Sequence, residues 1–135
     1  MYQDIVYSLS EVTRFYSKEQ KRGILVKPSQ ELGCQDNIQV LLSSNPFITN
    51  IQLEMQGCIL LKASVNALCL AIENKSKTES IQIIDNFLKM IQGENFNPEF
   101  LTESLKIFEK FKLALSRRTC LTLGALELKK TIETN

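Results

Sequence analysis

Alternation of apolar and polar residues predicts two β-strands in the first half of the chain. Residues 38–42 place an apolar side chain at every second position, and residues 48–56 do so at Ile51, Leu53 and Met55. This is the period of a strand with one buried face. Residues 44–46, Ser-Asn-Pro, provide a turn between them. Residues 23–27 are compatible with a further short strand, and residues 28–36 have the composition of a loop.

Helical spacing, with apolar residues three and four positions apart, dominates the remainder of the sequence. It predicts an amphipathic N-terminal helix over residues 1–17 and a mostly apolar, buried helix over residues 59–74. The next helix is expected to have its N-cap at Thr78 and to end at Gly93.

Two further helices complete the predicted helical layer. Asn97-Pro98 has the signature of an N-cap followed by proline in the first turn, and it opens a helix with apolar residues at Leu101, Leu105, Phe108 and Phe111. The final helix is expected to begin near Cys120. The pattern predicts a single α+β domain over residues 1–135, in which a small antiparallel sheet packs against helices.

Composition limits the classes of function. The chain has 135 residues, of which 44% are hydrophobic, and its net charge is +1. This charge balance does not favour binding to nucleic acid or to an anionic membrane. The sequence shows neither a secretory signal nor an apolar run approaching the ~20 residues of a membrane span, so we expect a cytoplasmic protein.

The chain contains no histidine. Catalysis by Ser-His-Asp or Cys-His groups within this chain is therefore excluded. Metal sites that need a histidine of this chain are excluded as well, so any metal would be bound by Cys, Asp or Glu.

Three of the four cysteines lie at predicted element boundaries: Cys34 before the first clear strand, Cys58 between a strand and a helix, and Cys120 at the start of the last helix. The partial positive charge of a helix N-terminus favours thiolate, the form that binds metals or attacks sulfur. Cys69, in contrast, lies within the apolar helix and is expected to be a buried core residue.

Together with Asp36, the three boundary cysteines would supply three sulfur ligands and one oxygen ligand. Such a set suits Zn²⁺, with an iron–sulfur cluster as the next choice. The spacing of these residues alone leaves open the alternative that all the cysteines are core residues without a metal.

Four segments resemble the U-type iron–sulfur assembly proteins, the IscU/NifU/SufU family. Residues 33–36 (Gly-Cys-Gln-Asp) resemble its Cys-Gly-Asp loop, and residues 56–58 (Gln-Gly-Cys) resemble its second cysteine motif. Residues 117–123 (Arg-Arg-Thr-Cys-Leu-Thr-Leu) resemble its third cysteine motif, and residues 1–5 resemble its opening helix. The likeness covers nearly the whole chain.

Within this family the chain is most similar to the SufU branch. Residues 93–112 resemble the helical insertion that SufU-like proteins carry between the second and third site cysteines. Thr119 occupies the position of a histidine in Isc-type scaffolds, and Arg117 matches an arginine of SufU-like proteins.

This resemblance implies a fold with about three antiparallel strands covered by helices, and a role in iron–sulfur cluster assembly. It implies zinc bound by Cys34, Asp36, Cys58 and Cys120, with Cys34 accepting persulfide sulfur from a pyridoxal-phosphate cysteine desulfurase of the SufS type. Arg117 would contact that desulfurase, and downstream assembly proteins would receive the sulfur. The chain would then be a sulfurtransferase-like accessory protein.

Two other functions are compatible with the same residues. The chain could be the scaffold on which a [2Fe–2S] cluster is assembled, or a divergent, non-catalytic binding module with the same fold. Metal content separates the zinc-bound sulfur acceptor from the cluster scaffold, because Zn²⁺ is colourless whereas a cluster absorbs visible light.

Overall fold

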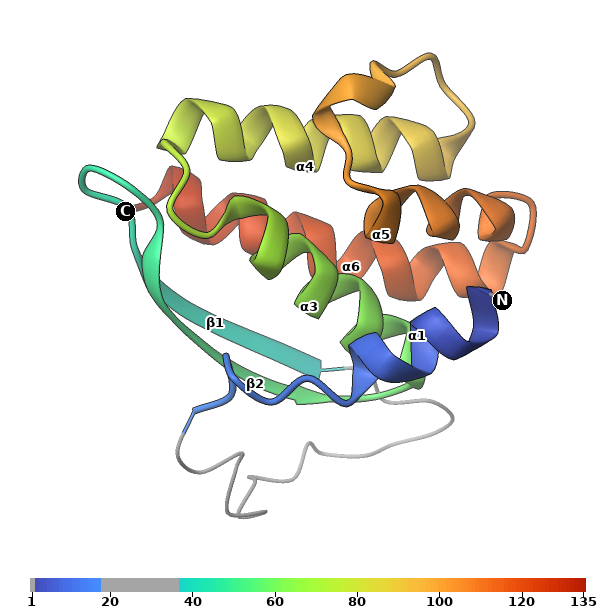
Figure 1. Cartoon of the computed structure of the whole chain (residues 1–135), viewed down its shortest axis with the longest axis horizontal. Coiled ribbons are helices and arrows are strands. Elements are labelled where there is room, and N and C mark those ends of the chain that lie inside the picture. Colours follow the sequence, from blue (N-terminus) through green and yellow to red (C-terminus); the bar gives the residue numbers. More distant parts are fainter. Residues whose placement is uncertain (1, 18–36) are drawn as a thin grey trace.

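Helices cover a two-stranded sheet in the computed structural model, which describes residues 2–17 and 37–135 (Figure 1). The described elements are α1 (Tyr2–Ser10), β1 (Asn37–Ser43), β2 (Thr49–Gln56), α3 (Ile59–Ile72), α4 (Lys77–Gln92), η1 (Pro98–Phe100), α5 (Glu103–Lys106), η2 (Ile107–Phe111) and α6 (Leu115–Glu133). The predicted α+β class is confirmed. Within the described residues, no helix combines the length and apolar character needed to cross a membrane.

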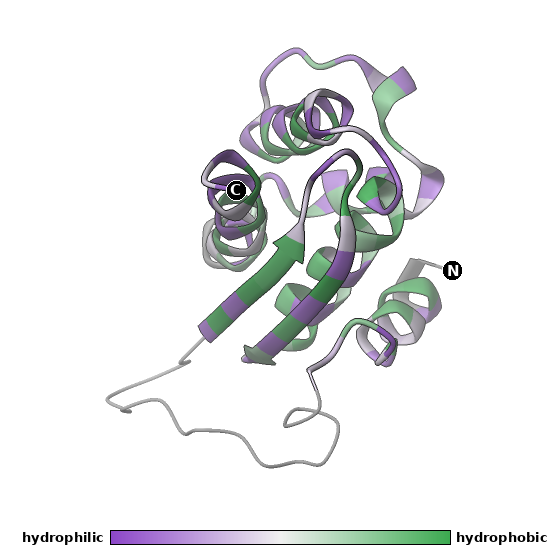
Figure 2. Ribbon diagram, turned by 90° about the vertical axis from the view of Figure 1, so that its left-hand side faces the viewer, coloured by the Kyte–Doolittle hydropathy of each residue, from purple (hydrophilic) through white to green (hydrophobic). Residues whose placement is uncertain are grey.

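The sheet confirms the predicted alternation. β1 and β2 are antiparallel, with Asn37 opposite Gln56 and Val40 opposite Leu53. Buried apolar residues alternate with more exposed residues along both strands, and the exposed residues are polar except Leu41 of β1 (Figure 2), because successive side chains of a strand point to opposite faces. The inward-facing residues of both strands are buried in the core. The possible strand at 23–27 lies outside the described residues.

The predicted N-terminal helix over residues 1–17 is too long. α1 ends at Ser10, and the residues after Val12 approach the free edge of β2. There the Leu53 N–H donates to the Phe15 carbonyl at 2.7 Å, and the Ser17 N–H donates to the Leu53 carbonyl at 2.9 Å. The Phe15 side chain is buried in the core while its backbone pairs with the sheet, so this apolar residue does not extend the helix.

A buried asparagine of α3 fixes the end of α1. The Asn66 amide nitrogen donates to the Leu9 carbonyl at 2.8 Å and to the Val12 carbonyl at 3.1 Å. Carbonyls at the C-terminus of a helix lack partners within the helix. Asn66 supplies a donor to the Val12 carbonyl, just beyond the helix, and a second donor to the Leu9 carbonyl, which also accepts from the Val12 N–H at 3.2 Å. The helix can therefore stop where the chain turns toward β2.

Asn66→Ala is expected to destabilise the protein by about 1–3 kcal/mol, because the Val12 carbonyl loses its donor. Urea unfolding followed by circular dichroism measures this loss. Gln82→Ala is the control, since Gln82 is an exposed amide residue on α4, and such surface changes stay within about 0.5 kcal/mol. Equal stability of the two variants would contradict the assigned role of Asn66.

Helix α4 begins and ends at residues suited to those positions. The predicted N-cap at Thr78 is wrong, because Ser76 caps the helix and forms a reciprocal capping box with Glu79. The predicted end at Gly93 is confirmed, and Gly93 adopts a left-handed conformation with φ 79°.

The segment between α4 and α6 contains the predicted helical insertion, but as three short pieces instead of one helix. Asn97 caps η1 by accepting a hydrogen bond from the Glu99 N–H at 3.0 Å. The chain becomes extended at Leu101, where φ is −109° and ψ is 136°, and α5 and η2 follow. Leu101, Leu105 and Phe108 are nevertheless buried, and Phe111 is partly buried against the core, so the apolar spacing identified the side of the insertion that packs on the core.

Helix α6 packs against α3, α4 and β1 (Figure 1). It begins at Leu115 rather than near Cys120, so Cys120 lies in its second turn. Gly124, one turn further along, faces α3 so closely that an added Cβ would overlap the Val65 Cγ2 methyl and lie 3.3 Å from the Leu61 Cδ1 atom. This close approach of α6 to α3 positions the cysteines described next.

Candidate metal centre

Cys58 and Cys120 meet at one end of the sheet. Their Sγ atoms are 3.2 Å apart, although 62 positions separate them in the sequence. Cys58 follows β2 and is the N-cap residue of α3, whereas Cys120 comes from α6. Both side chains are half-buried and pack against the edge of the core. The predicted convergence of these two cysteines is observed.

The separation of the two sulfurs suits a shared ion. The two residues are not joined in a disulfide, because 3.2 Å is well beyond the ~2.05 Å of an S–S bond. Zn–S bonds of about 2.3 Å at tetrahedral angles would place two sulfurs about 3.8 Å apart. A shift of a few tenths of an ångström by each side chain would therefore bring both thiolates to ligand positions.

Cys34 and Asp36, the other two predicted ligands, lie outside the described residues. Asn37, which follows them in the sequence, pairs with Gln56, two residues before Cys58. Among residues 2–17 and 37–135, no group of three or more Cys, Asp or Glu side chains is arranged to hold a metal. The described part of the chain therefore supplies a pair of thiols, which is half of the predicted ligand set.

Cys69 is fully buried within α3, as predicted. Burial raises the pKa of its thiol, and the nearby Glu73 carboxylate raises the pKa further, whereas Arg14 lowers it. Its thiol therefore stays protonated and inaccessible at neutral pH, which suits a core residue and not a metal ligand.

A groove of about 800 Å³ runs beside Cys58. Its walls come from α1, the start of α3, the end of the insertion and the first turns of α6, and its lining residues are Val6, Tyr7, Cys58, Ile59, Leu60, Phe111, Ala114 and Arg117. Tyr7 is 57% exposed and Ile59 is 42% exposed. The groove thus presents an apolar surface and the Arg117 side chain beside one of the thiols.

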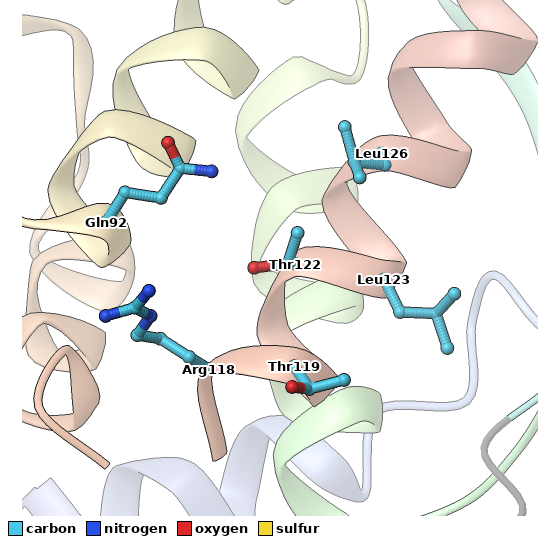
Figure 3. Close-up of a pocket in the computed structure, with 6 residues that line it drawn as sticks. All are labelled: Gln92, Arg118, Thr119, Thr122, Leu123 and Leu126. Carbon is cyan, nitrogen blue, oxygen red and sulfur yellow. The ribbon is translucent and has the colours of Figure 1, made fainter. Parts of the chain in front are cut away.

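The two neighbouring arginines occupy different surroundings. Arg117 lines the Cys58 groove, whereas Arg118 lines a second groove of about 470 Å³ between α4 and the outer face of α6 (Figure 3). There Arg118 points toward Gln92, and it also donates to the Lys112 carbonyl at 3.1 Å. Of these two arginines, Arg117 is the one placed to contact a partner bound over Cys58.

Sequence reasoning missed two features of this region. Tyr7 lies outside the apolar spacing of the N-terminal helix, so its position in the groove had no sequence signal. The Gln56 Oε1 atom is buried without a hydrogen-bond partner within the described part of the chain. Alternation placed Gln56 only on the polar face of β2, because burial of a single atom depends on tertiary contacts.

No protein-family model matches the chain. An uncharacterized protein of Borreliella burgdorferi is 32% identical over 107 residues, which cover 79% of this chain and 72% of the Borreliella protein. Similarity at this level over most of both chains indicates a common family.

Solved structures show the same fold. A putative iron–sulfur cluster assembly scaffold protein for the SUF system, from Fervidobacterium islandicum AW-1, superposes with a TM-score of 0.75 at 22% identity, covering 97% of this chain and 93% of that chain. A hypothetical protein superposes with a TM-score of 0.77 at 24% sequence identity, covering 98% of this chain and 96% of that chain.

The N-terminal part of a nitrogen-fixing NifU-like protein from Brucella abortus gives a TM-score of 0.74 at 16% identity, covering 98% of this chain and 92% of that chain. The resemblance predicted from the cysteine motifs is therefore confirmed for the fold. The chain belongs to the same family as the Borreliella burgdorferi protein, and its fold is the IscU/NifU-like fold of these SufU- and NifU-like structures.

Proposed function

We propose that this protein acts in iron–sulfur cluster assembly, with Cys58 and Cys120 as part of its reactive site. The observation that carries the proposal is the 3.2 Å contact between their sulfurs at the end of the sheet. Two structures with the same fold are a putative assembly scaffold of the SUF system and a NifU-like protein.

The donor atoms fit a soft metal. Thiolates are preferred ligands of zinc and of iron–sulfur clusters, and the two sulfurs are near the separation that one ion requires. Cys58 and Cys120 would hold Zn²⁺ together with Cys34 and Asp36, the ligands that the sequence resemblance proposes. When bound, zinc would stabilise the thiolate form of its cysteines without redox chemistry of its own.

Cys34 is the proposed sulfur acceptor, and a pyridoxal-phosphate cysteine desulfurase is its proposed donor. The Cys58 groove supports a partner surface here, because it combines exposed apolar side chains with Arg117. Protein interfaces commonly have an apolar centre with polar or charged residues at the rim. Sulfur would pass from Cys34 to downstream assembly proteins.

Addition of this protein to its desulfurase is expected to increase the release of sulfide from cysteine, measured in the presence of a thiol reductant. Arg117→Glu is expected to lower the stimulation, since it reverses the charge at the edge of the groove. The matched control is Arg118→Glu, which changes the same charge in the separate groove of α6. Equal loss in both variants would contradict a specific role for Arg117.

A [2Fe–2S] scaffold function uses the same thiols, and it is favoured by the scaffold role given to the Fervidobacterium islandicum structure. Anaerobic reconstitution with iron and sulfide separates the two functions. A scaffold would gain visible absorbance that depends on Cys58 and Cys120. Sulfide stimulation without such a chromophore would favour the sulfur acceptor. Partner binding with neither property would identify a non-catalytic module.

A further inference from the structure

We infer that Cys58 and Cys120 form an intramolecular disulfide when the metal-free protein meets a peroxide. The reactants are two thiols of this chain and hydrogen peroxide. The product would remove two sulfurs from the metal centre, so that oxidation and metal binding exclude one another. The inference rests on the contact between the thiols and does not depend on which metal or cluster the protein carries.

The geometry brings the two sulfurs close to bonding distance. They are 3.2 Å apart, so the gap must close by about 1.2 Å to reach the length of a disulfide. Cys58 lies at the junction of β2 and α3, with extended backbone angles. Gly57 precedes it at φ 154°. A junction residue can adjust its side chain without breaking hydrogen bonds of a helix interior.

Access and burial distinguish this pair from Cys69. Cys58 lines the open groove of about 800 Å³, so a small oxidant can reach its sulfur from solvent. Cys69 is fully buried, and burial raises the pKa of its thiol, which keeps it in the less reactive protonated form. Among the three cysteines that the structure describes, oxidation is therefore directed to the pair at the end of the sheet.

The reaction proceeds in two balanced steps. The Cys58 thiolate attacks one peroxide oxygen, an S–O bond forms, the O–O bond breaks, and the leaving hydroxide takes a proton to become water. The Cys120 thiolate then attacks the Cys58 sulfur, an S–S bond forms, and the sulfenic oxygen leaves as a second water. The two cysteines lose two electrons, and one peroxide is reduced to two waters.

The test uses the full-length Cys34→Ser/Cys69→Ser variant, in which Cys58 and Cys120 are the remaining cysteines. After chelation of metals and treatment with hydrogen peroxide, intact mass spectrometry is expected to show the loss of two hydrogens in a monomer. Proteolysis under non-reducing conditions should release a linked pair of peptides containing Cys58 and Cys120. Dithiothreitol should restore the original mass.

The wild-type protein provides the second measurement, which keeps the test decisive if the double variant misfolds. Its linked peptides are expected to contain the same pair. Persistence of both thiols, accumulation of sulfinic acid, or pairing of Cys34 with either cysteine in place of the Cys58–Cys120 link would overturn the inference.

A zinc arm separates this inference from the proposed function. Where the protein binds zinc, preloading is expected to slow disulfide formation, because both thiolates are then ligands. Where it binds no zinc, shows no sulfide stimulation and gains no chromophore on reconstitution, the proposed function fails, yet the oxidation of the metal-free protein still decides this inference. A wild-type protein that binds zinc but forms no disulfide after chelation would refute the inference alone.

Discussion

Cys120→Ser is expected to lose the metal that the wild-type protein retains. Protein expressed with zinc and purified under reducing conditions should contain about one zinc per chain. A serine hydroxyl binds zinc much more weakly than a cysteine thiolate does. Loss of a residue that only hydrogen-bonds to a metal ligand lowers metal affinity by ~10–100-fold, so loss of a ligand itself should lower the zinc affinity by more. Elemental analysis after dialysis against a weak chelator measures the result.

The variants Cys58→Ser and Cys69→Ser distinguish loss of a zinc ligand from loss of a core cysteine. Cys58→Ser should lose zinc in the same way, because its sulfur contacts that of Cys120. Cys69→Ser should keep zinc even if it is less stable, since Cys69 is buried within α3. A wild-type protein without metal under zinc-replete, reducing conditions would contradict both metal-dependent functions. Retention of zinc by Cys58→Ser and Cys120→Ser would remove both residues from the proposed ligand set.

Local sequence signals predicted the elements whose determinants lie within the elements themselves. The two strands were predicted because alternation of apolar and polar residues reports a half-buried sheet directly. The end of α4 was predicted because Gly93 supplies the left-handed conformation that closes the helix. Burial of Cys69 followed from its place in an uninterrupted apolar helix.

Elements that depend on tertiary contacts were predicted less well. Phe15 continues the helical spacing of α1, but the chain leaves the helix because Asn66 and Leu53 supply hydrogen bonds from other elements. The start of α6 was missed because its N-cap, Ala114, makes no side-chain capping bond. The insertion was predicted as one helix because its buried residues have helical spacing whether or not the backbone is continuous.

The candidate site was predictable in part. Cys58 and Cys120 were identified as candidates from their places at or near element boundaries. The motif resemblance predicted that they belong to one site. Their contact depends on how closely α6 approaches α3, which no local pattern encodes. Cys34 and Asp36 remain predictions, since they lie outside the described residues.

Gly124→Leu is expected to disrupt the thiol pair without changing either cysteine. Even a Cβ at this position overlaps the Val65 Cγ2 methyl, and Val65 is a buried β-branched residue with little freedom to rotate. Overpacking should cost about 1–3 kcal/mol, against which the better helix propensity of leucine returns less than about 1 kcal/mol. Relief of the overlap requires α6 to move away from α3, and Cys120 lies one turn from Gly124.

Zinc affinity and the rate of disulfide formation should therefore both fall in Gly124→Leu, while its circular dichroism spectrum stays helical. The matched control is Thr122→Leu, which places the same leucine side chain on the face of α6 where Thr122 lines the second groove (Figure 3). That variant should keep both properties, because its added atoms enter open space. If Gly124→Leu also kept both properties at normal stability, the spacing of α3 and α6 would not control the distance between the two thiols.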